Sequence, residues 1–148
     1  MKITALFITL AFISLLNDAF ASEKLRFVEP ESFKDKQIVD FIAKSSETST
    51  DEYILAHIDL NNDAIDEYIV KPKLVQNCPK APLCPYSIMA FENRLPISLK
   101  QFDAHKILIS NKKTYGVRGI IVYNDFYNDF KFKTFNWSPY SFQYESFD

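Results

Sequence analysis

Glycine and histidine are scarce in this chain of 148 residues, which holds two of each. Two glycines cannot form a glycine-rich loop of the kind that cradles phosphate, and no serine lies in a Gly-x-Ser-x-Gly turn. Neither His57 nor His105 stands near a residue that the sequence marks as a nucleophile. Because a hydrolase needs a nucleophile or an activated water beside a positioned base, we expect a protein that is not an enzyme.

An excess of charge of one sign is also missing. Lys and Arg number 17 against 19 Asp and Glu, which gives a net charge of -2. Nucleic-acid-binding domains usually carry a basic patch or stripe, so we expect no nucleic-acid partner. The 14 Phe and 8 Tyr make the chain aromatic, and residues 22–148 hold enough apolar side chains for a single domain with one core.

The first 21 residues are predicted to be a cleavable signal peptide. Lys2 supplies a positive start, "ITALFITLAFISLL" is an apolar stretch, and "AFA" at residues 19–21 has the small-x-small cleavage pattern. The apolar stretch is short for a bilayer span, and no cysteine follows it for a lipid anchor. The alternative is an uncleaved anchor or a buried helix. We expect a periplasmic protein without a membrane anchor after cleavage.

Only two cysteines are present, Cys78 and Cys84, and both lie in the part expected to be exported. An oxidising compartment favours a disulfide, which would close the short loop "CPKAPLC". A zinc site is the alternative. It would need two more ligands, and the two histidines have no metal-like spacing to the cysteines.

The periodicity predicts one helix followed by strands. In "PESFKDKQIVDFIAKSS", residues 30–46, Ser32 can cap the helix with Asp35 three residues later, and an apolar stripe is formed by Phe33, Ile38, Phe41 and Ile42. Strands are expected at 53–60, 67–72, 86–92, 106–110, 119–125, 130–137 and 141–147, and the segment around Pro96 is an edge strand or a loop. The expected fold class is mostly β (α+β): an N-terminal helix followed by an antiparallel sheet or sandwich of about six to eight strands.

Oxygen-bearing side chains gather in "HIDLNNDAIDEYIV", between two predicted strands. Calcium-binding loops place such oxygens at alternating positions and close with a later acid. The candidate ligands for Ca²⁺ are Asp59, Asn61, Asp63, the carbonyl of Ile65, and Glu67. Ala64 stands where such loops usually have glycine, whereas Asn62 tolerates the left-handed conformation. The alternative is a plain hairpin turn in which Asn and Asp bind their own backbone.

The ordered motifs resemble those of a group of small exported bacterial proteins. "DLNNDAIDEYIV" is similar to the group's "DLNGDGxxDYIV" signature, and "KLVQNCPKAPLCPYSIMAF" holds the short Cys-to-Cys loop that follows it. "GVRGIIVY" and "NWSPYSFQY" match later motifs, although Gly119 stands where Asp is common. The resemblance covers residues 54–144. It implies kinship with periplasmic lysozyme inhibitors of the invertebrate-lysozyme-inhibitor type, and with immunity proteins against cell-wall-degrading effectors of secretion systems.

Such an inhibitor would present a rigid loop with a few aromatic or arginine anchors. The candidate partner-binding residues lie in "KKTYGVRG" and "YNDFYNDF" and are Tyr115, Arg118, Tyr123, Asp125, Phe126 and Tyr127. Acidic residues among the aromatics suit a basic partner enzyme. The alternative is ordinary hairpin construction with the aromatics in the core, and we expect Trp137 and Tyr144 to pair in this structural way.

The sequence and this resemblance together predict a periplasmic protein that binds and blocks a peptidoglycan-degrading enzyme, as an immunity protein does. A second hypothesis is a calcium-binding structural or envelope-accessory protein without an enzyme target.

Overall fold

The computed structural model describes residues 22–125, 127–128 and 131–146. The predicted signal peptide, residues 1–21, and the candidate partner residue Phe126 lie outside the described residues. Within the described ranges, no helix has both the length and the apolar character that a membrane span requires.

One α-helix and nine strands are present among the described residues, and all strand pairs are antiparallel. The helix is α2 (Phe33–Ser46), and short 3-10 turns are η1 (Thr50–Glu52) and η2 (Val75–Asn77). The strands are β1 (Ser22–Glu23), β2 (Tyr53–Ile58), β3 (Glu67–Pro72), β4 (Cys84–Glu92), β5 (Leu95–Ala104), β6 (Lys106–Thr114), β7 (Val117–Tyr123), β8 (Phe132–Ser138) and β9 (Gln143–Ser146). The prediction of a mostly-β fold with one helix before about six to eight strands is confirmed, since eight strands follow α2.

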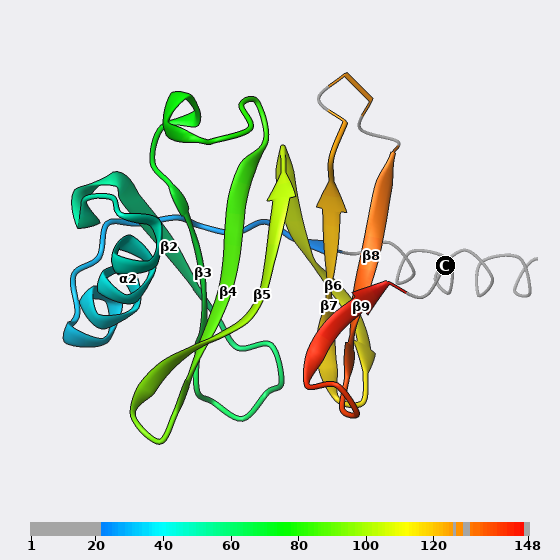
Figure 1. Cartoon of the computed structure of the whole chain (residues 1–148). Coiled ribbons are helices and arrows are strands. Elements are labelled where there is room, and N and C mark those ends of the chain that lie inside the picture. Colours follow the sequence, from blue (N-terminus) through cyan, green and yellow to red (C-terminus); the bar gives the residue numbers. More distant parts are fainter. Residues whose placement is uncertain (1–21, 126, 129–130, 147–148) are drawn as a thin grey trace, which may run out of the picture.

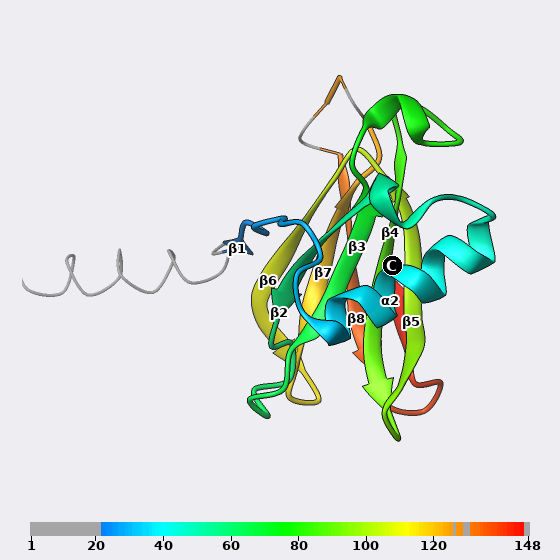
Figure 2. The same cartoon turned by 90° about the vertical axis from the view of Figure 1, so that its left-hand side faces the viewer.

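The strands form two sheets that pack face to face. The order in the larger sheet is β1-β6-β7-β8-β9, and the order in the smaller sheet is β2-β3-β4-β5. Helix α2 covers the other face of the smaller sheet, so the molecule has three layers (Figures 1 and 2). The strand that contains Pro96 is β5, at the edge of the smaller sheet, which is where a proline is tolerated in a sheet.

Two apolar cores hold these layers together. The core between the sheets contains fully buried residues such as Ile69, Ile88, Ile109 and Ile120. The core between α2 and the smaller sheet contains Ile38, Val39, Ile42 and Ala43 from the helix, packed on Tyr53, Leu55, Tyr68, Val70 and Met89 from the sheet. The smaller sheet is therefore buried on both faces, which explains the long runs of apolar residues in β3 and β4.

The capping box at the start of α2 is confirmed. The side chain of Ser32 accepts the backbone N–H of Asp35 at 3.1 Å, and Asp35 Oδ2 accepts the backbone N–H of Ser32 at 3.0 Å. The predicted apolar stripe is partly wrong, because Phe33 and Phe41 are exposed. The face that meets the sheet instead holds Asp35, Ile38, Val39, Ile42 and Ala43, at the spacing of one helical face.

The loops collect at the two ends of the sandwich. The loops β2–β3, β4–β5, β6–β7 and β8–β9 lie at the lower end in Figures 1 and 2. The β3–β4 connection, which contains η2 and both cysteines, lies at the upper end together with the β5–β6 turn and the β7–β8 loop. We call the lower end the hairpin end, defined by residues 59–66, 92–95, 113–117 and 139–143.

Candidate functional site

The Asp59 loop, residues 59–66, connects β2 to β3 and is held by its own side chains. Asp59 Oδ1 accepts the N–H of Asn62 at 2.6 Å, and its Oδ2 accepts the N–H of Ala64 at 3.0 Å. Asp63 Oδ1 accepts the N–H of Ile65 at 2.7 Å. Asn62 and Ala64 have φ angles of 62° and 65°. The backbone therefore takes the left-handed conformation at both positions, although Ala64 carries a Cβ that disfavours it.

Leu60 closes the sandwich at this end. Its side chain is 1 % exposed and belongs to the core between the sheets. Its N–H donates to Glu67 Oε2 at 2.8 Å, and its carbonyl accepts the N–H of Arg118 in β7 at 2.8 Å. The second bond ties the Asp59 loop to the larger sheet. A small cavity of about 70 Å³ remains beside this plug and is lined by Leu60, Asn61, Glu67, Leu99, Val117, Trp137 and Tyr144.

The pKa values of two carboxyl groups in this region are shifted in opposite directions. Desolvation raises the pKa of Asp59, but hydrogen bonds from the backbone of the loop outweigh it, so the pKa of Asp59 lies below its usual value. Burial raises the pKa of Glu67, and the negative charges of Asp63 and Asp59 raise it further, against the lowering effect of the Leu60 N–H. The pKa of Glu67, at the start of β3, therefore lies above its usual value, whereas that of Asp59 lies below.

The candidate calcium ligands are not arranged around a common point, as a calcium site requires. Calcium takes about six to eight oxygen ligands at roughly 2.3–2.6 Å. Here Asp59 and Asp63 accept backbone N–H groups, Asn61 donates its amide to Asp63 at 2.9 Å, and Glu67 points to the N–H of Leu60. In the part of the chain that is described, no three His, Cys, Asp or Glu side chains are grouped as a metal site requires. Calcium binding would need these oxygens to come together around the ion.

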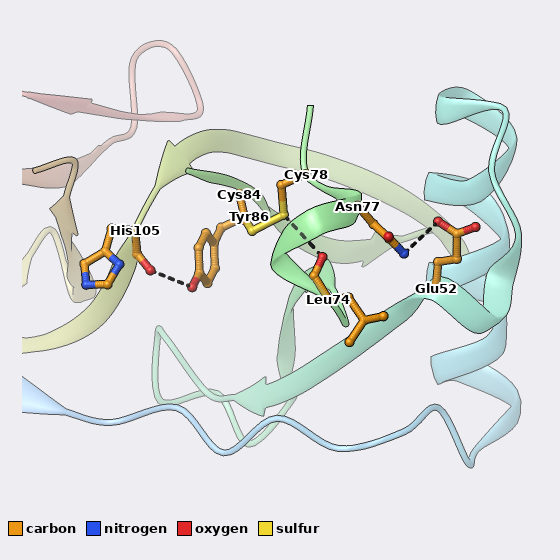
Figure 3. The surroundings of a disulfide bond; sticks show 7 residues. All are labelled: Glu52, Leu74, Asn77, Cys78, Cys84, Tyr86 and His105. Atoms are coloured by element: carbon orange, nitrogen blue, oxygen red, sulfur yellow. Dashed lines mark hydrogen bonds between the residues drawn. A yellow bond between two sulfur atoms is a disulfide. The ribbon is translucent and has the colours of Figure 1, made fainter. Parts of the chain in front are cut away.

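The predicted disulfide is confirmed. Cys78 and Cys84 are joined, with a sequence separation of 6 residues, so their sulfurs are not zinc ligands. Both half-cystines are buried, and Cys84 opens β4. Figure 3 shows how the loop is fixed on either side: Asn77 donates to Glu52 Oε2 at 3.5 Å, and the hydroxyl of Tyr86 donates to the carbonyl of His105 at 3.4 Å.

A carboxylate–histidine cluster links α2 to β2 and was not predicted from the sequence. Asp35 is 3 % exposed, and its Oδ1 lies 3.3 Å from His57 Nε2 as an ion pair. Among the described residues, none donates a hydrogen bond to this Oδ1. His57 Nδ1 lies 3.6 Å from Asp66 Oδ2. Burial raises the pKa of Asp35, but hydrogen bonds with Ser32 and with the N–H of Glu31, together with the charge of His57, lower it overall. The helical register of Asp35 was the available signal, because position 35 shares a face with buried positions.

The first predicted partner loop is the β6–β7 turn. The ring of Tyr115 is exposed and lies 6.3 Å from that of Tyr140 in the β8–β9 loop. The side chain of Arg118 is only 12 % exposed. Its guanidinium donates to the Ser110 carbonyl at 3.1 Å and to Glu23 Oε2 at 2.8 Å, with a third bond to an asparagine side chain. Arg118 thus fixes strands β1, β6 and β7 relative to one another.

The second predicted partner loop lies at the opposite end of β7. The ring of Tyr123 is covered by Lys106 Nζ at 4.4 Å from its centroid, and Asp125 Oδ2 lies 3.4 Å from Lys131 Nζ. Tyr127 is almost fully exposed, and its N–H donates to Asp125 Oδ1 at 3.0 Å. A hollow of about 660 Å³ adjoins these residues and is lined by Pro82, Leu83, Val122, Asn124, Asp125, Tyr127, Lys131, Phe132 and Lys133. The structure therefore separates the two predicted partner loops by the length of a strand.

The last hairpin has the predicted structural pair. Trp137 and Tyr144 are cross-strand partners with ring centroids 5.5 Å apart. The buried Tyr144 hydroxyl donates to the carbonyl of Arg118 at 3.1 Å. Burial raises the pKa of Tyr144 far above its ordinary value.

Comparison with known proteins identifies no relative. No family model matches the chain, and neither the curated proteins nor the solved structures contain a match. The resemblance to exported lysozyme inhibitors and immunity proteins therefore stays a prediction.

Proposed function

We propose that this chain is a non-enzymatic periplasmic binding protein that blocks a peptidoglycan-degrading enzyme, as an immunity protein would. One observation carries the proposal: large aromatic side chains are exposed on the loops at the ends of the sandwich. Tyr115, Tyr127, Tyr140 and Phe142 have exposed fractions of 65–94 %. Exposed aromatic residues on otherwise polar loops are the usual anchors of protein interfaces, and they contribute little to the stability of the free protein.

The scaffold suits an inhibitor that blocks a cleft by steric occlusion. The disulfide fixes the β3–β4 connection, the Asp59 loop binds its own backbone, and Arg118 clamps three strands of the larger sheet. A preorganised loop loses little conformational freedom on binding, so more of its contact energy remains as affinity. The predicted signal peptide and the resemblance support the periplasmic location and the class of target.

The test is capture followed by inhibition. Immobilised protein of residues 22–148 is exposed to envelope and secreted proteins of its own species, and retained proteins are identified by mass spectrometry. The purified enzyme is then assayed on a peptidoglycan suspension, whose clearing should slow in proportion to added protein. Phe33→Ala, which changes an exposed ring on α2 outside the loop ends, is the matched control and should inhibit equally. Undiminished clearing at a molar excess of the wild-type protein would contradict the proposal.

A calcium-binding structural role is the second candidate, and the backbone of the Asp59 loop favours it. Asn62 and Ala64 have the left-handed conformation that a glycine-containing calcium loop needs. A ligand that binds only the folded state raises the melting temperature by mass action. A rise in Tm with calcium over chelator that Asp63→Ala abolishes would support this candidate. Equal Tm values in calcium and in chelator would remove it.

A further inference from the structure

The hairpin end carries an unusual combination of backbone conformation and exposure. Among the described non-glycine residues, every positive φ except that of Glu47 occurs there. Asparagine tolerates this conformation, but bulky residues adopt it at a cost. Tyr115 and Phe142 have φ angles of 53° and 52° and exposed fractions of 65 % and 71 %. Their side chains thus occupy strained positions without the compensation of burial.

Exposed apolar side chains from four loops lie at this end. Ile65 belongs to the Asp59 loop, Leu95 follows the β4–β5 turn, Tyr115 lies in the β6–β7 turn, and Tyr140 and Phe142 lie in the β8–β9 loop. Figures 1 and 2 agree that these loops lie at the same end of the sandwich. The contact between the Tyr115 and Tyr140 rings shows that two of the loops touch. Exposed apolar side chains that gather at one end of a protein can mark a surface for a protein partner.

The charges on this end indicate the kind of partner. The hairpin end holds four acidic residues, Asp59, Asp63, Asp66 and Glu92, and two basic residues, Arg94 and Lys113, so its net charge is 2 − 4 = −2. The acids lie on the β2–β3 loop and at the β4–β5 turn of the smaller sheet, at the same end of the molecule as the aromatic loops of the larger sheet. The complementary partner is a protein surface that is both basic and apolar.

We infer that the hairpin end is the docking surface for the target enzyme, with Tyr115, Tyr140 and Phe142 as its anchors. This inference rests on the proposed function. The strain at Tyr115 and Phe142 distinguishes this end from the β7–β8 loop that holds Tyr127, where no described non-glycine residue has a positive φ. Strained residues persist where function requires them, and here the requirement is a side chain at a turn position that glycine would occupy more easily. Arg118 acts as a positioning residue because its contacts hold β7 beneath these turns.

The binding test uses the oxidised protein of residues 22–148 and a panel of purified basic lysozymes and amidases, with Kd measured by calorimetry. Tyr140→Ala and Phe142→Ala should each raise the Kd at least tenfold, as expected for interface anchors. Phe33→Ala, which removes an exposed ring on α2 outside the loop ends, is the matched control and should change the Kd by less than about twofold. Tyr127→Ala tests the opposite end of the molecule and should weaken binding less than the hairpin-end variants. If Tyr127→Ala weakens binding and the hairpin-end variants do not, the inference is overturned while the proposed function stands.

A stability test examines the strain at Phe142 without a partner. Phe142→Gly should raise the Tm by roughly 1–3 °C, because glycine adopts the positive φ without strain and the lost ring is exposed. A fall in Tm would mean that Phe142 serves the fold, and the inference would fail. If no enzyme in the panel binds the wild-type protein, the proposed function fails, and this second measurement then decides whether the side chain is kept at the expense of stability.

Discussion

Truncation of Leu60 tests whether the Asp59 loop closes the sandwich. The side chain is 1 % exposed and packs in the core between the two sheets. Leu60→Ala removes this plug but leaves the backbone bonds to Glu67 and Arg118 in place, since both involve main-chain atoms of residue 60. The variant therefore isolates the contribution of the side chain.

The expected loss in the free energy of unfolding is about 3 kcal/mol. Leucine-to-alanine substitutions in buried sites cost about 2–5 kcal/mol, and the cost rises with the size of the residual cavity. The new space at Leu60 would merge with the existing cavity of about 70 Å³, which limits collapse, whereas water can enter beside Glu67 and moderate the loss. In a domain of this size the change corresponds to a fall in Tm of about 10 °C.

The assay is urea denaturation of the oxidised protein of residues 22–148, with stability compared at equal m-values so that the denatured state is unchanged. The matched control is Leu95→Ala, which truncates the same residue type on the same end of the molecule but at an exposed fraction of 66 %. It should change stability by less than about 0.5 kcal/mol. If both variants lose the same small amount of unfolding free energy, the side chain of Leu60 does not close this end of the sandwich.

Three further predictions concern the cap, the disulfide and a half-buried carboxyl. Ser32→Ala should lower the free energy of unfolding by about 1 kcal/mol, measured by urea denaturation, because α2 loses the acceptor at its N-terminus. Replacement of Cys78 and Cys84 by serine should lower it by about 2 kcal/mol in the same assay, the chain-entropy value for so short a loop. Glu67 has a raised pKa in the folded state, so its contribution to stability is greatest below its unfolded pKa and declines as the pH rises through the folded pKa. Glu67→Gln, which keeps an acceptor for the Leu60 N–H, should therefore show a smaller decline between pH 4 and pH 7 in thermal melts than the wild-type protein, and an equal decline would contradict the assignment.

Local sequence signals predicted much of the fold. The capping box at Ser32 and Asp35 and the strand Glu67–Pro72 were found at their observed positions. These signals depend on the chemistry of neighbouring residues, which the sequence displays directly. The edge position of the strand around Pro96 also followed from the missing N–H of proline.

The apolar stripe of α2 was partly wrong because a charged residue interrupts it. Asp35 lies on the same helical face as Ile38 and Ile42, but a carboxylate side chain is not expected in an apolar core. The structure compensates for its burial with the Ser32 N–H and the nearby His57. Phe33 is apolar, but its position on the helix points away from that face.

The candidate site was harder to predict, since its parts come together only through topology. The sequence offered Tyr115 and Tyr127 as parts of comparable partner loops, but β7 separates them, and the neighbour of Tyr115 is Tyr140 from another hairpin. Arg118 looked like an anchor because arginine is common at interfaces, yet its guanidinium is committed to β1 and β6. The three-dimensional fold decides which loops of different hairpins become neighbours. It also decides whether a long side chain such as that of Arg118 binds within the protein.

The shortage of glycine is also evident in the turns of the hairpin end, where other residues have positive φ angles. Turns with positive φ are needed at the hairpin end whatever the function, and glycine at those positions would be free of strain. Gly116 is the only described glycine with a positive φ, while Arg94, Tyr115 and Phe142 hold side chains in that conformation. Hairpin construction alone does not account for these choices, because a more stable turn would result from glycine. A docking surface at this end, as inferred above, would require side chains at these turn positions, and the rings of Tyr115 and Phe142 are exposed there.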